Sequence, residues 1–329
     1  MSSELLVYMS GSFVPLSEAR ISIFDSALVV GDMVFEATRT FQQRPFRLRH
    51  HLERLYGSMR YAEIDCGLSI EELEAATYQT IEVNRERLAD GFDFQMTHNV
   101  SPGIFGPFRS GFPETSGPTV TISCWPLKER LAGYAPQYDT GVHGVIPSQR
   151  SVPSQYIDPK AKNRSRLYYR RADHQVHRVD PDAWAVLLDG AGYIAEGTGS
   201  NVFLVHNEAL YSPEGRNILR GVTRGFVLEL ARELGIPVHE RNLEPYDLLN
   251  AEEAFFTSTP FGIMPMTRVD GLPVGSGTPG PVTQRLLAAF GEHVGVDLVA
   301  QARGAAEAVA GGQATAEKVE PQPVAAARH

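Results

Sequence analysis

The chain has 329 residues, of which 43% are hydrophobic and 21% charged, and its formal net charge is −9. These proportions are typical of a globular protein with room for two domains. The negative net charge argues against nucleic acid or an anionic membrane surface as a partner, because binding to either requires a basic face.

Neither the cysteines nor the apolar segments indicate a secreted or membrane protein. Cys66 and Cys124 are the only cysteines and form no CxxC pair, so they predict neither a zinc site nor a disulfide framework. Residues 1–20 lack a basic segment followed by an apolar run, and no apolar stretch is long enough to span a bilayer. We therefore expect a cytoplasmic protein without a structural metal.

The first 126 residues are predicted to fold as a small N-terminal α/β domain. Apolar residues alternate on both sides of the "SGS" turn at 10–12, which is typical of a β-hairpin. Helical periodicity follows over 49–64 and 69–88, and two strand-like runs cover 92–100 and 119–127. Residues 127–141 contain glycine and proline, which predicts an interdomain linker.

Residues 142–302 are predicted to form a larger domain around a mixed sheet. Short strands separated by turns follow one another from 183 to 212, and a helix is expected to begin at Thr223. A strand–loop–strand segment and a last helix at 280–294 complete it. Residues 303–329 lack periodicity and predict a disordered tail. The expected fold class is α/β (α+β) with two domains.

Five short motifs contain residue types that suit cofactor chemistry. In "IDPKAK" two lysines lie close together, and Lys162 precedes Glu196 of "AEGTGSN" by 34 positions. "RGVT" at 220–223 opens a helix, "HLERL" at 51–55 presents an arginine, and "TSTP" at 257–260 supplies hydroxyl groups. In this order and spacing, the motifs resemble the fold-type IV pyridoxal-phosphate enzymes, which include branched-chain and D-amino-acid aminotransferases.

The resemblance extends from about Ile21 to about Gly295 and implies a class IV transaminase. By similarity to the family's "DPxxK" pattern, Lys162 is the amine that forms a Schiff base with pyridoxal 5'-phosphate, and Lys160 is a solvated neighbour. The other partners that the resemblance implies are an amino donor, a keto-acid acceptor and a second copy of the chain. In such a homodimer the N-terminal domain of one subunit completes the pocket of the other.

The resemblance also assigns the remaining cofactor contacts. Glu196 is expected to keep the pyridine nitrogen protonated, because at about 4 Å and a dielectric of about 20 the attraction is roughly 4 kcal/mol. That energy corresponds to about three pKa units. The phosphate is expected at a helix N-terminus, with Arg54 adding a bidentate pair. The expected phosphate contacts are Arg54, Val222, Thr223, Ser258 and Thr259. The alternatives are a helix cap for Thr223 and a surface salt bridge for Arg54.

The substrate-binding motifs depart from the family's patterns. "FQMTHNVSP" resembles a stretch of D-amino-acid aminotransferases in which an arginine and a histidine follow Ser-Pro, but this chain has Gly103 and Phe105. Phe35 stands where that subfamily carries a tyrosine. The branched-chain enzymes use backbone N–H groups of a Thr-Ala turn, whereas Pro260 has no N–H. Neither familiar carboxylate trap is intact.

Other cations could hold a substrate carboxylate, and we considered Arg39, Arg164, Arg166 and His98. The first two are the primary candidates, because an arginine forms charge-assisted bonds with a carboxylate. "GIMP" at 262–265 also resembles (R)-selective amine transaminases, whose substrates can lack a carboxylate. An aminodeoxychorismate-lyase-like eliminase and a cofactor-binding protein without turnover are the remaining alternatives.

Overall fold

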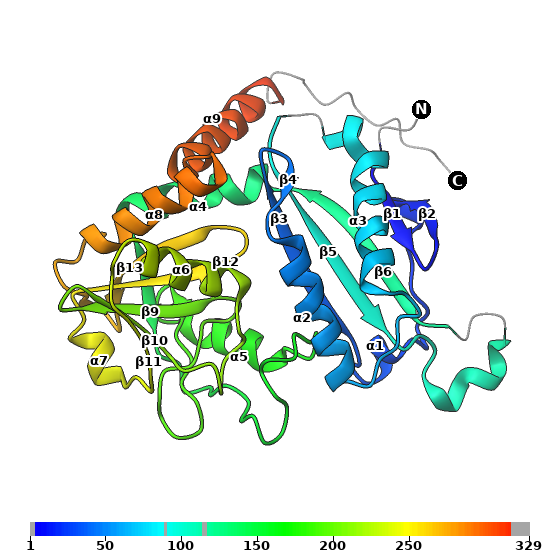
Figure 1. The fold of residues 1–329 in the computed structure, drawn as a ribbon, viewed down its shortest axis with the longest axis horizontal. Helices are drawn as coiled ribbons and strands as arrows, with labels where there is room; N and C mark the ends of the chain where they lie inside the picture. The colour runs from blue at the N-terminus through cyan, green and yellow to red at the C-terminus, as the bar shows by residue number, and fades with distance from the viewer. Residues whose placement is uncertain (1–3, 89–90, 114–116, 317–329) are drawn as a thin grey trace, which may run out of the picture.

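The computed structural model describes residues 4–88, 91–113 and 117–316, which form two β-sheets with helices packed against them (Figure 1). The N-terminal sheet is entirely antiparallel, in the order β2-β1-β6-β5-β3-β4. Its strands are β1 (Leu6–Met9), β2 (Ser12–Pro15), β3 (Val34–Phe41), β4 (Arg44–Pro45), β5 (Phe94–Ser101) and β6 (Thr119–Pro126). The predicted hairpin and the two later strands are confirmed.

The C-terminal sheet is mixed, in the order β11-β10-β9-β12-β13-β7-β8, with β14 paired to β13. Its strands are β7 (Val142–Val145), β8 (Trp184–Ala185), β9 (Asn201–His206), β10 (Ala209–Ser212), β11 (Val238–Glu240), β12 (Glu253–Ser258), β13 (Gly262–Val269) and β14 (Leu272–Pro273). The central strands β9, β12 and β13 are almost fully buried, because helices cover the sheet. Both sheets together give the mixed α/β architecture that was predicted.

Helices lie on both sheets. They are α1 (Ser26–Val29), α2 (Leu48–Tyr61), α3 (Ile70–Asn84), α4 (Lys128–Thr140), α5 (Leu167–Val176), α6 (Val222–Glu233), α7 (Pro245–Leu249), α8 (Pro281–Val294) and α9 (Leu298–Ala316), with short 3-10 turns η1 (Leu16–Glu18), η2 (Arg85–Leu88) and η3 (Gly106–Gly111). Within the described ranges, no helix is long and apolar enough to be a candidate membrane span.

Strand alternation in β3 decides which side chains reach the space between the sheets. Glu36 pairs with His98 of β5, and both lie on the face that α2 and α3 cover. Phe35 lies on the opposite face, because successive side chains of a strand point to opposite sides. The sheet therefore presents Phe35, and not His98, to the functional site described below.

Within the predicted linker at 127–141, residues 128–140 form the helix α4, and the role of this segment as a linker stays a prediction. Leu131, Ala135 and Tyr138 are buried at helical spacing along one side of α4. Burial of this side outweighs the backbone hydrogen bond that Pro136 removes. The strands of the first sheet precede α4 and those of the second follow it. A division into units of 1–126 and 142–302 remains our proposal.

The predicted tail is wrong for residues 303–316, which belong to α9. Ala305 is fully buried and packs against Leu127 and Leu131, where α9 lies along α4 (Figure 1). Alanine has the highest helix propensity, but its small side chain adds little to a hydrophobic pattern. The helix was therefore missed. Residues 317–329 lie outside the described part of the chain.

Candidate active site

One cleft contains all seven residues that were predicted to hold the cofactor. Its lining comes from α2, from Lys162 and the segment up to α5, from Tyr169 of α5, from the start of β9 with the loop before it, from the end of β12 with the residue after it, and from the first turn of α6 with the loop before it. These residues are Arg54, Lys162, Arg166, Tyr169, Glu196, Gly199, Ser200, Asn201, Leu219, Gly221, Val222, Thr223, Thr257, Ser258 and Thr259. The fold thus brings together predicted residues that lie far apart in the sequence.

Lys162 reaches this cleft from an irregular segment that is fixed at its backbone. Its N–H donates to Ser58 Oγ of α2 at 3.0 Å, and its carbonyl accepts the N–H of Phe35 at 2.9 Å. The amine lies 4.8 Å from the centre of the Phe35 ring. Burial lowers the pKa of Lys162 to about 7, and the charges of Arg54 and Arg166 act in the same direction. A large fraction of this amine is therefore neutral at pH 7.

Lys160 has different surroundings. Its Nζ lies 2.8 Å from Asp158 Oδ1 and donates to the carbonyl of Arg216 at 3.1 Å. The amine of Lys160 is thus engaged by a carboxylate and a carbonyl and is directed away from the cleft residues. Of the two lysines in "DPKAK", only Lys162 lines the cleft.

Glu196 is buried at the bottom of the cleft with both of its oxygens hydrogen-bonded. Oε1 accepts the hydroxyl of Tyr169 at 2.5 Å, and Oε2 accepts the N–H of Leu219 at 2.9 Å. Burial raises the pKa of Glu196, while these two hydrogen bonds and the charge of Arg166 oppose the rise. The arrangement fixes the carboxyl group in one orientation. Tyr169 was not among the predicted residues.

The N-terminus of α6 offers free backbone donors. Gly221 caps α6 without any side-chain hydrogen bond, which leaves N–H groups of the first turn, at Val222 and Thr223, open toward the cleft. A Cβ on Gly221 would lie 2.2 Å from Asn201 Oδ1, so only glycine allows this close approach. Ser258 and Thr259 lie on the same wall. Thr223 therefore lies where it can contact an anion, and it does not act as the helix cap.

Arg54 is held at the cleft by a buried carboxylate. Its Nε and Nη2 donate to the two oxygens of Glu36 at 2.6 and 2.8 Å, and its Nη1 donates to the carbonyl of Arg220 at 3.0 Å. His51 Nδ1 lies 2.8 Å from Glu36 Oε2. Although burial opposes ionisation, Arg54 and His51 hold the pKa of Glu36 well below its ordinary value. Arg54 is thus fixed beside the residue that precedes Gly221.

Of the residues considered for substrate binding, only Arg166 is among those that line the cleft, and two of the others are fully buried away from it. Arg39 is only 1% exposed, and its guanidinium donates to the carbonyls of Thr40 and Pro260 and to Gln301 Oε1. His98 is completely buried under α3, where its Nε2 lies 2.8 Å from Thr77 Oγ1. Neither side chain is available to a substrate, so both predictions are wrong.

The other substrate candidates lie beside Lys162. The guanidinium carbons of Arg164 and Arg166 lie 3.7 and 4.9 Å from the centre of the Phe35 ring. Pro260 is buried behind the cleft wall, with its carbonyl occupied by Arg39. Phe35 and the two arginines therefore form the side of the site next to the amine.

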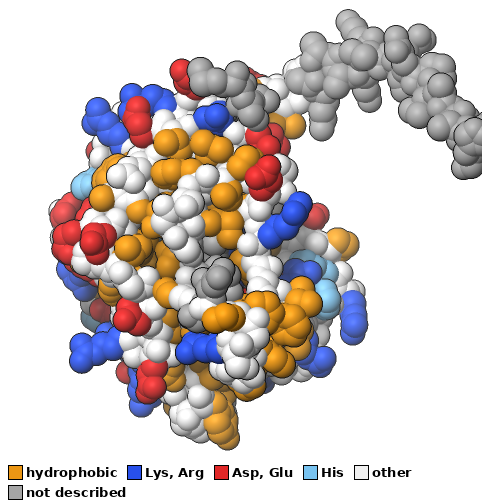
Figure 2. All heavy atoms as spheres, turned by 90° about the vertical axis from the view of Figure 1, so that its right-hand side faces the viewer, with side chains coloured by type: hydrophobic (Ala, Val, Ile, Leu, Met, Phe, Trp, Pro, Cys, Tyr) orange, Lys and Arg blue, Asp and Glu red, His pale blue; other side chains and the backbone are white. Residues whose placement is uncertain are grey.

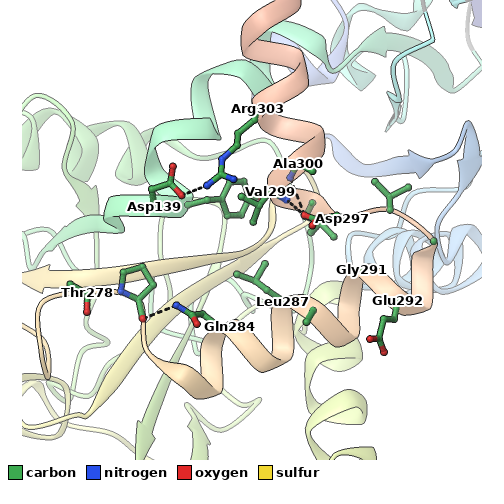
Figure 3. A pocket seen from close by; sticks show the side chains of 16 residues that line it. Asp139, Thr278, Gln284, Leu287, Gly291, Glu292, Asp297, Val299, Ala300 and Arg303 are labelled. Carbon is green, nitrogen blue, oxygen red and sulfur yellow. Dashed lines mark hydrogen bonds and ion pairs between the residues drawn. The ribbon is translucent and has the colours of Figure 1, made fainter.

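A larger groove lies elsewhere, between α8 and the α4–α9 pair, and has a volume of about 910 Å³. Figure 3 shows Asp139 of α4 facing Arg303 of α9 along it, and their side chains form an ion pair at 2.5 Å. None of its lining residues lines the cleft of Lys162. Its volume alone does not indicate chemistry, because none of the described residues that line it is a lysine, so it offers no amine like that of Lys162.

The fold and the site together define a class of enzyme. A family model described as "Amino-transferase class IV" matches residues 33–269, and the chain therefore belongs to the class IV aminotransferases. A putative branched-chain-amino-acid aminotransferase of Methanocaldococcus jannaschii is 33% identical over 286 residues, covering 86% of this chain and 94% of that one. The D-alanine aminotransferase of Bacillus licheniformis is 28% identical over 86% and 95% of the two chains.

Solved structures agree with this assignment. The crystal structure of the Escherichia coli branched-chain amino acid aminotransferase has 29% sequence identity and a TM-score of 0.79. The match covers 87% of this chain and 93% of that chain. The predicted fold-type IV architecture and the transaminase class are confirmed. The eliminase and the amine-transaminase alternatives are not favoured.

Proposed function

We propose that this chain is a pyridoxal-phosphate-dependent transaminase that moves an amino group between an amino acid and an α-keto acid, with Lys162 as the cofactor-binding amine. The observation that carries the proposal is the meeting of Lys162 and Glu196 in one cleft with the N-terminus of α6. Only a neutral amine attacks an aldehyde. Because the pKa of Lys162 is lowered, its side chain supplies such an amine. The covalent link to the cofactor would be a Schiff base at its Nζ.

The residues of the cleft fit the charged parts of pyridoxal phosphate. The open N–H groups of Val222 and Thr223 and the guanidinium of Arg54 suit a phosphate. Thr257 Oγ1 is buried without a hydrogen-bond partner among the described residues and lines the same cleft. Glu196, held by two hydrogen bonds, suits the protonated ring nitrogen.

When bound, pyridoxal phosphate supplies an electron sink that acidifies the α-carbon of an attached substrate. The side chains would then have three tasks. Nζ of Lys162 would take a proton from the α-carbon of a bound substrate and return it, as a general base and acid. Tyr169 donates to Glu196 and keeps that carboxylate directed into the cleft. Phe35 excludes water from one side of the amine.

A half-reaction assay tests the proposal. Purified holoenzyme is mixed with D- and L-amino acids, and the loss of the cofactor's visible absorption band is followed without any keto acid. We expect complete conversion with at least one amino acid, and recovery of the band only when a keto acid is added. Continuous formation of a keto product without an acceptor would instead indicate an eliminase. No change with any amino acid would contradict the transaminase proposal.

We also propose that the enzyme is a homodimer. Ile23, Leu28 and Val30 around α1, and Leu167 at the start of α5, are more than half exposed. Figure 2 shows many exposed hydrophobic side chains on the side of the molecule that carries the N-terminal sheet. Burial of such side chains against a second copy is favourable. Sedimentation should give a dimer, and a fully active monomer would contradict this proposal.

A cytoplasmic location is our last proposal on function. Cys66 and Cys124 are both free thiols buried in the N-terminal unit, and they belong to different core clusters. Proteins of reducing compartments typically keep such cysteines unpaired. Fractionation of the native cells, with the chain detected by antibody, should recover it with the cytoplasmic proteins, and recovery with secreted proteins would contradict this location.

A further inference from the structure

Two arginines of the segment before α5 lie against one aromatic ring of the N-terminal sheet. The guanidinium of Arg164 lies 3.7 Å from the centre of the Phe35 ring, and that of Arg166 lies 4.9 Å from it. Arg166 also lies 5.0 Å from the ring of Tyr169 and lines the cleft of Lys162. The two cations thus extend from the cleft wall to its outer side.

Neither guanidinium has a carboxylate partner within the described part of the chain. Arg164 donates through Nε and Nη2 to the amide oxygen of Asn99, at 3.0 and 2.6 Å. Arg166 donates through Nε to the carbonyl of Asn163 at 2.7 Å. By contrast, Arg170 of α5 lies 3.7 Å from Asp173. Arg164 and Arg166 are therefore held in place by neutral oxygens, and neither forms an ion pair within the described ranges, although the charge of Arg166 acts on Glu196 at longer range.

A guanidinium that is partly surrounded by protein and has no ion-pair partner carries a free-energy cost, which is larger for the half-buried Arg166 than for the more exposed Arg164. Burial lowers the pKa of Arg164 to about 10, and the neighbouring charge of Arg166 adds to this effect. The cost is relieved when an anion binds between the two guanidinium groups. The cofactor phosphate has its own donors at Arg54 and the first turn of α6, so the anion to be expected here comes from the substrate.

The backbone also explains why the family's usual carboxylate contacts cannot serve. Gly103 has a φ of +78°, and a Cβ there would lie 2.0 Å from the carbonyl of Gly117, so this position cannot carry a cationic side chain. Pro260 has no N–H, and its carbonyl accepts a hydrogen bond from Arg39. A substrate carboxylate needs another site in this chain.

We propose that Arg164 and Arg166, which both contact the Phe35 ring, form the site that binds the carboxylate of the substrate. Asn99 accepts hydrogen bonds from Arg164 and holds it in place. This inference rests on the transaminase function proposed above. Arg166 would place the carboxylate within the cleft, and Arg164 would add charge from its outer side. The enzyme would then require amino acids and keto acids, and simple amines would be poor substrates.

Binding of an unreactive acid to the holoenzyme tests this site without turnover. The probes are 4-methylvalerate, which has a carboxylate but no amine, and the neutral 4-methylvaleramide of the same shape. Calorimetry should show that the wild-type enzyme binds the acid about tenfold or more tightly than the amide. Equal affinity for the two probes in the wild-type enzyme would overturn the proposal whatever the variants show.

The variants Arg164→Gln and Arg166→Gln locate the effect. Each should weaken binding of the acid about tenfold or more and leave binding of the amide unchanged. Arg170→Gln, a few residues further on in α5 and paired with Asp173, is the matched control and should bind the acid like the wild type. Unchanged affinity for the acid in both arginine variants would assign the carboxylate to other residues.

The half-reaction separates this inference from the function on which it rests. If amino acids convert the cofactor but the acid and the amide bind alike, the enzyme is a transaminase without this arginine site. If the acid binds through the two arginines but no amino acid converts the cofactor, the site is correct and the transaminase proposal fails. A faster half-reaction with (R)-1-phenylethylamine than with every amino acid would overturn the carboxylate requirement.

Discussion

The carboxylate of Glu36 accepts two hydrogen bonds from the guanidinium of Arg54, one from Nε to Oε1 at 2.6 Å and one from Nη2 to Oε2 at 2.8 Å. Glu36 is fully buried in β3, on the face that α2 covers. Arg54 extends from α2 to the carbonyl of Arg220, directly before the N-terminus of α6. A buried acid of one sheet thus fixes a cation beside the N-terminus of a helix that packs on the other sheet.

Glu36→Gln should weaken pyridoxal phosphate binding about tenfold or more, because Arg54 loses a charged partner that fixes its orientation. Quenching of protein fluorescence during titration of the apoenzyme measures the affinity. Glu53→Gln, on the exposed side of α2 and 3.6 Å from Arg49, is the matched control. Equal cofactor affinity in both variants would show that Glu36 does not position Arg54.

Glu36 should also make the stability depend on pH in the acid range. Its pKa in the folded protein lies below the ordinary value of 4.5, so its stabilising contribution is fully present above that pH. The contribution is lost as the pH falls below about 4.5. Denaturant unfolding of the wild type and of Glu36→Gln should therefore converge in acid, and a constant difference in unfolding free energy from pH 7 to pH 3 would contradict this assignment.

Glu196→Gln should slow the half-reaction about 10²-fold or more, since an amide cannot hold the proton on the ring nitrogen by charge. Cofactor binding should remain largely intact, because the phosphate contacts are elsewhere. Stopped-flow measurement of the absorption change gives the rate. Glu214→Gln, in a surface pair with Arg216, should react like the wild type. A wild-type rate for Glu196→Gln would reduce this residue to a structural role.

The amine of Lys162 should titrate near pH 7 in the apoenzyme. Competitive labelling with trace acetic anhydride, analysed peptide by peptide, reports the neutral fraction of each lysine. Labelling of Lys162 should rise with pH through about 7, and Arg166→Gln should move the midpoint upward because a repelling charge is removed. A Lys162 midpoint that coincides with that of Lys160 would show that the cleft does not activate the amine.

Arg39→Gln should destabilise the protein by about 2 kcal/mol and leave binding of 4-methylvalerate unchanged. The Arg39 guanidinium is buried and joins β3 to Gln301 of α9 and to the carbonyl of Pro260. Denaturant unfolding measures the loss, and Arg303→Gln, which removes an exposed pair with Asp139, should cost much less. Reduced affinity of Arg39→Gln for 4-methylvalerate would show that Arg39 contributes to substrate binding after all.

Local motifs were sufficient to predict residues that the fold brings together in one cleft, and their binding of the cofactor stays a prediction. Lys162, Glu196 and Thr223 each belong to a short segment whose order and spacing match a family, and the fold brings these segments together. Tyr169 and Glu36 were missed, because their roles depend on contacts between elements that are far apart in sequence. A carboxylate in an apolar strand was the one signal that could have identified Glu36.

The predictions for Arg39, His98 and α9 were wrong for equally specific reasons. Arg39 and His98 were chosen as cations near family motifs, but strand pairing and the position of α3 decide which side chains are buried. The helix α9 was missed because alanine dominates it, and its burial against α4 depends on small side chains. Sequence patterns identify the faces of amphipathic helices but not such close contacts.

The attachment of the cofactor to Lys162 is the central claim, and reduction with borohydride tests it most directly. The holoenzyme is treated with sodium borohydride, digested, and analysed by mass spectrometry for a lysine that carries the reduced cofactor. We predict that the modification is found on Lys162 in the peptide that contains "DPKAK". Modification of Lys160 instead, or of neither lysine, would contradict the account.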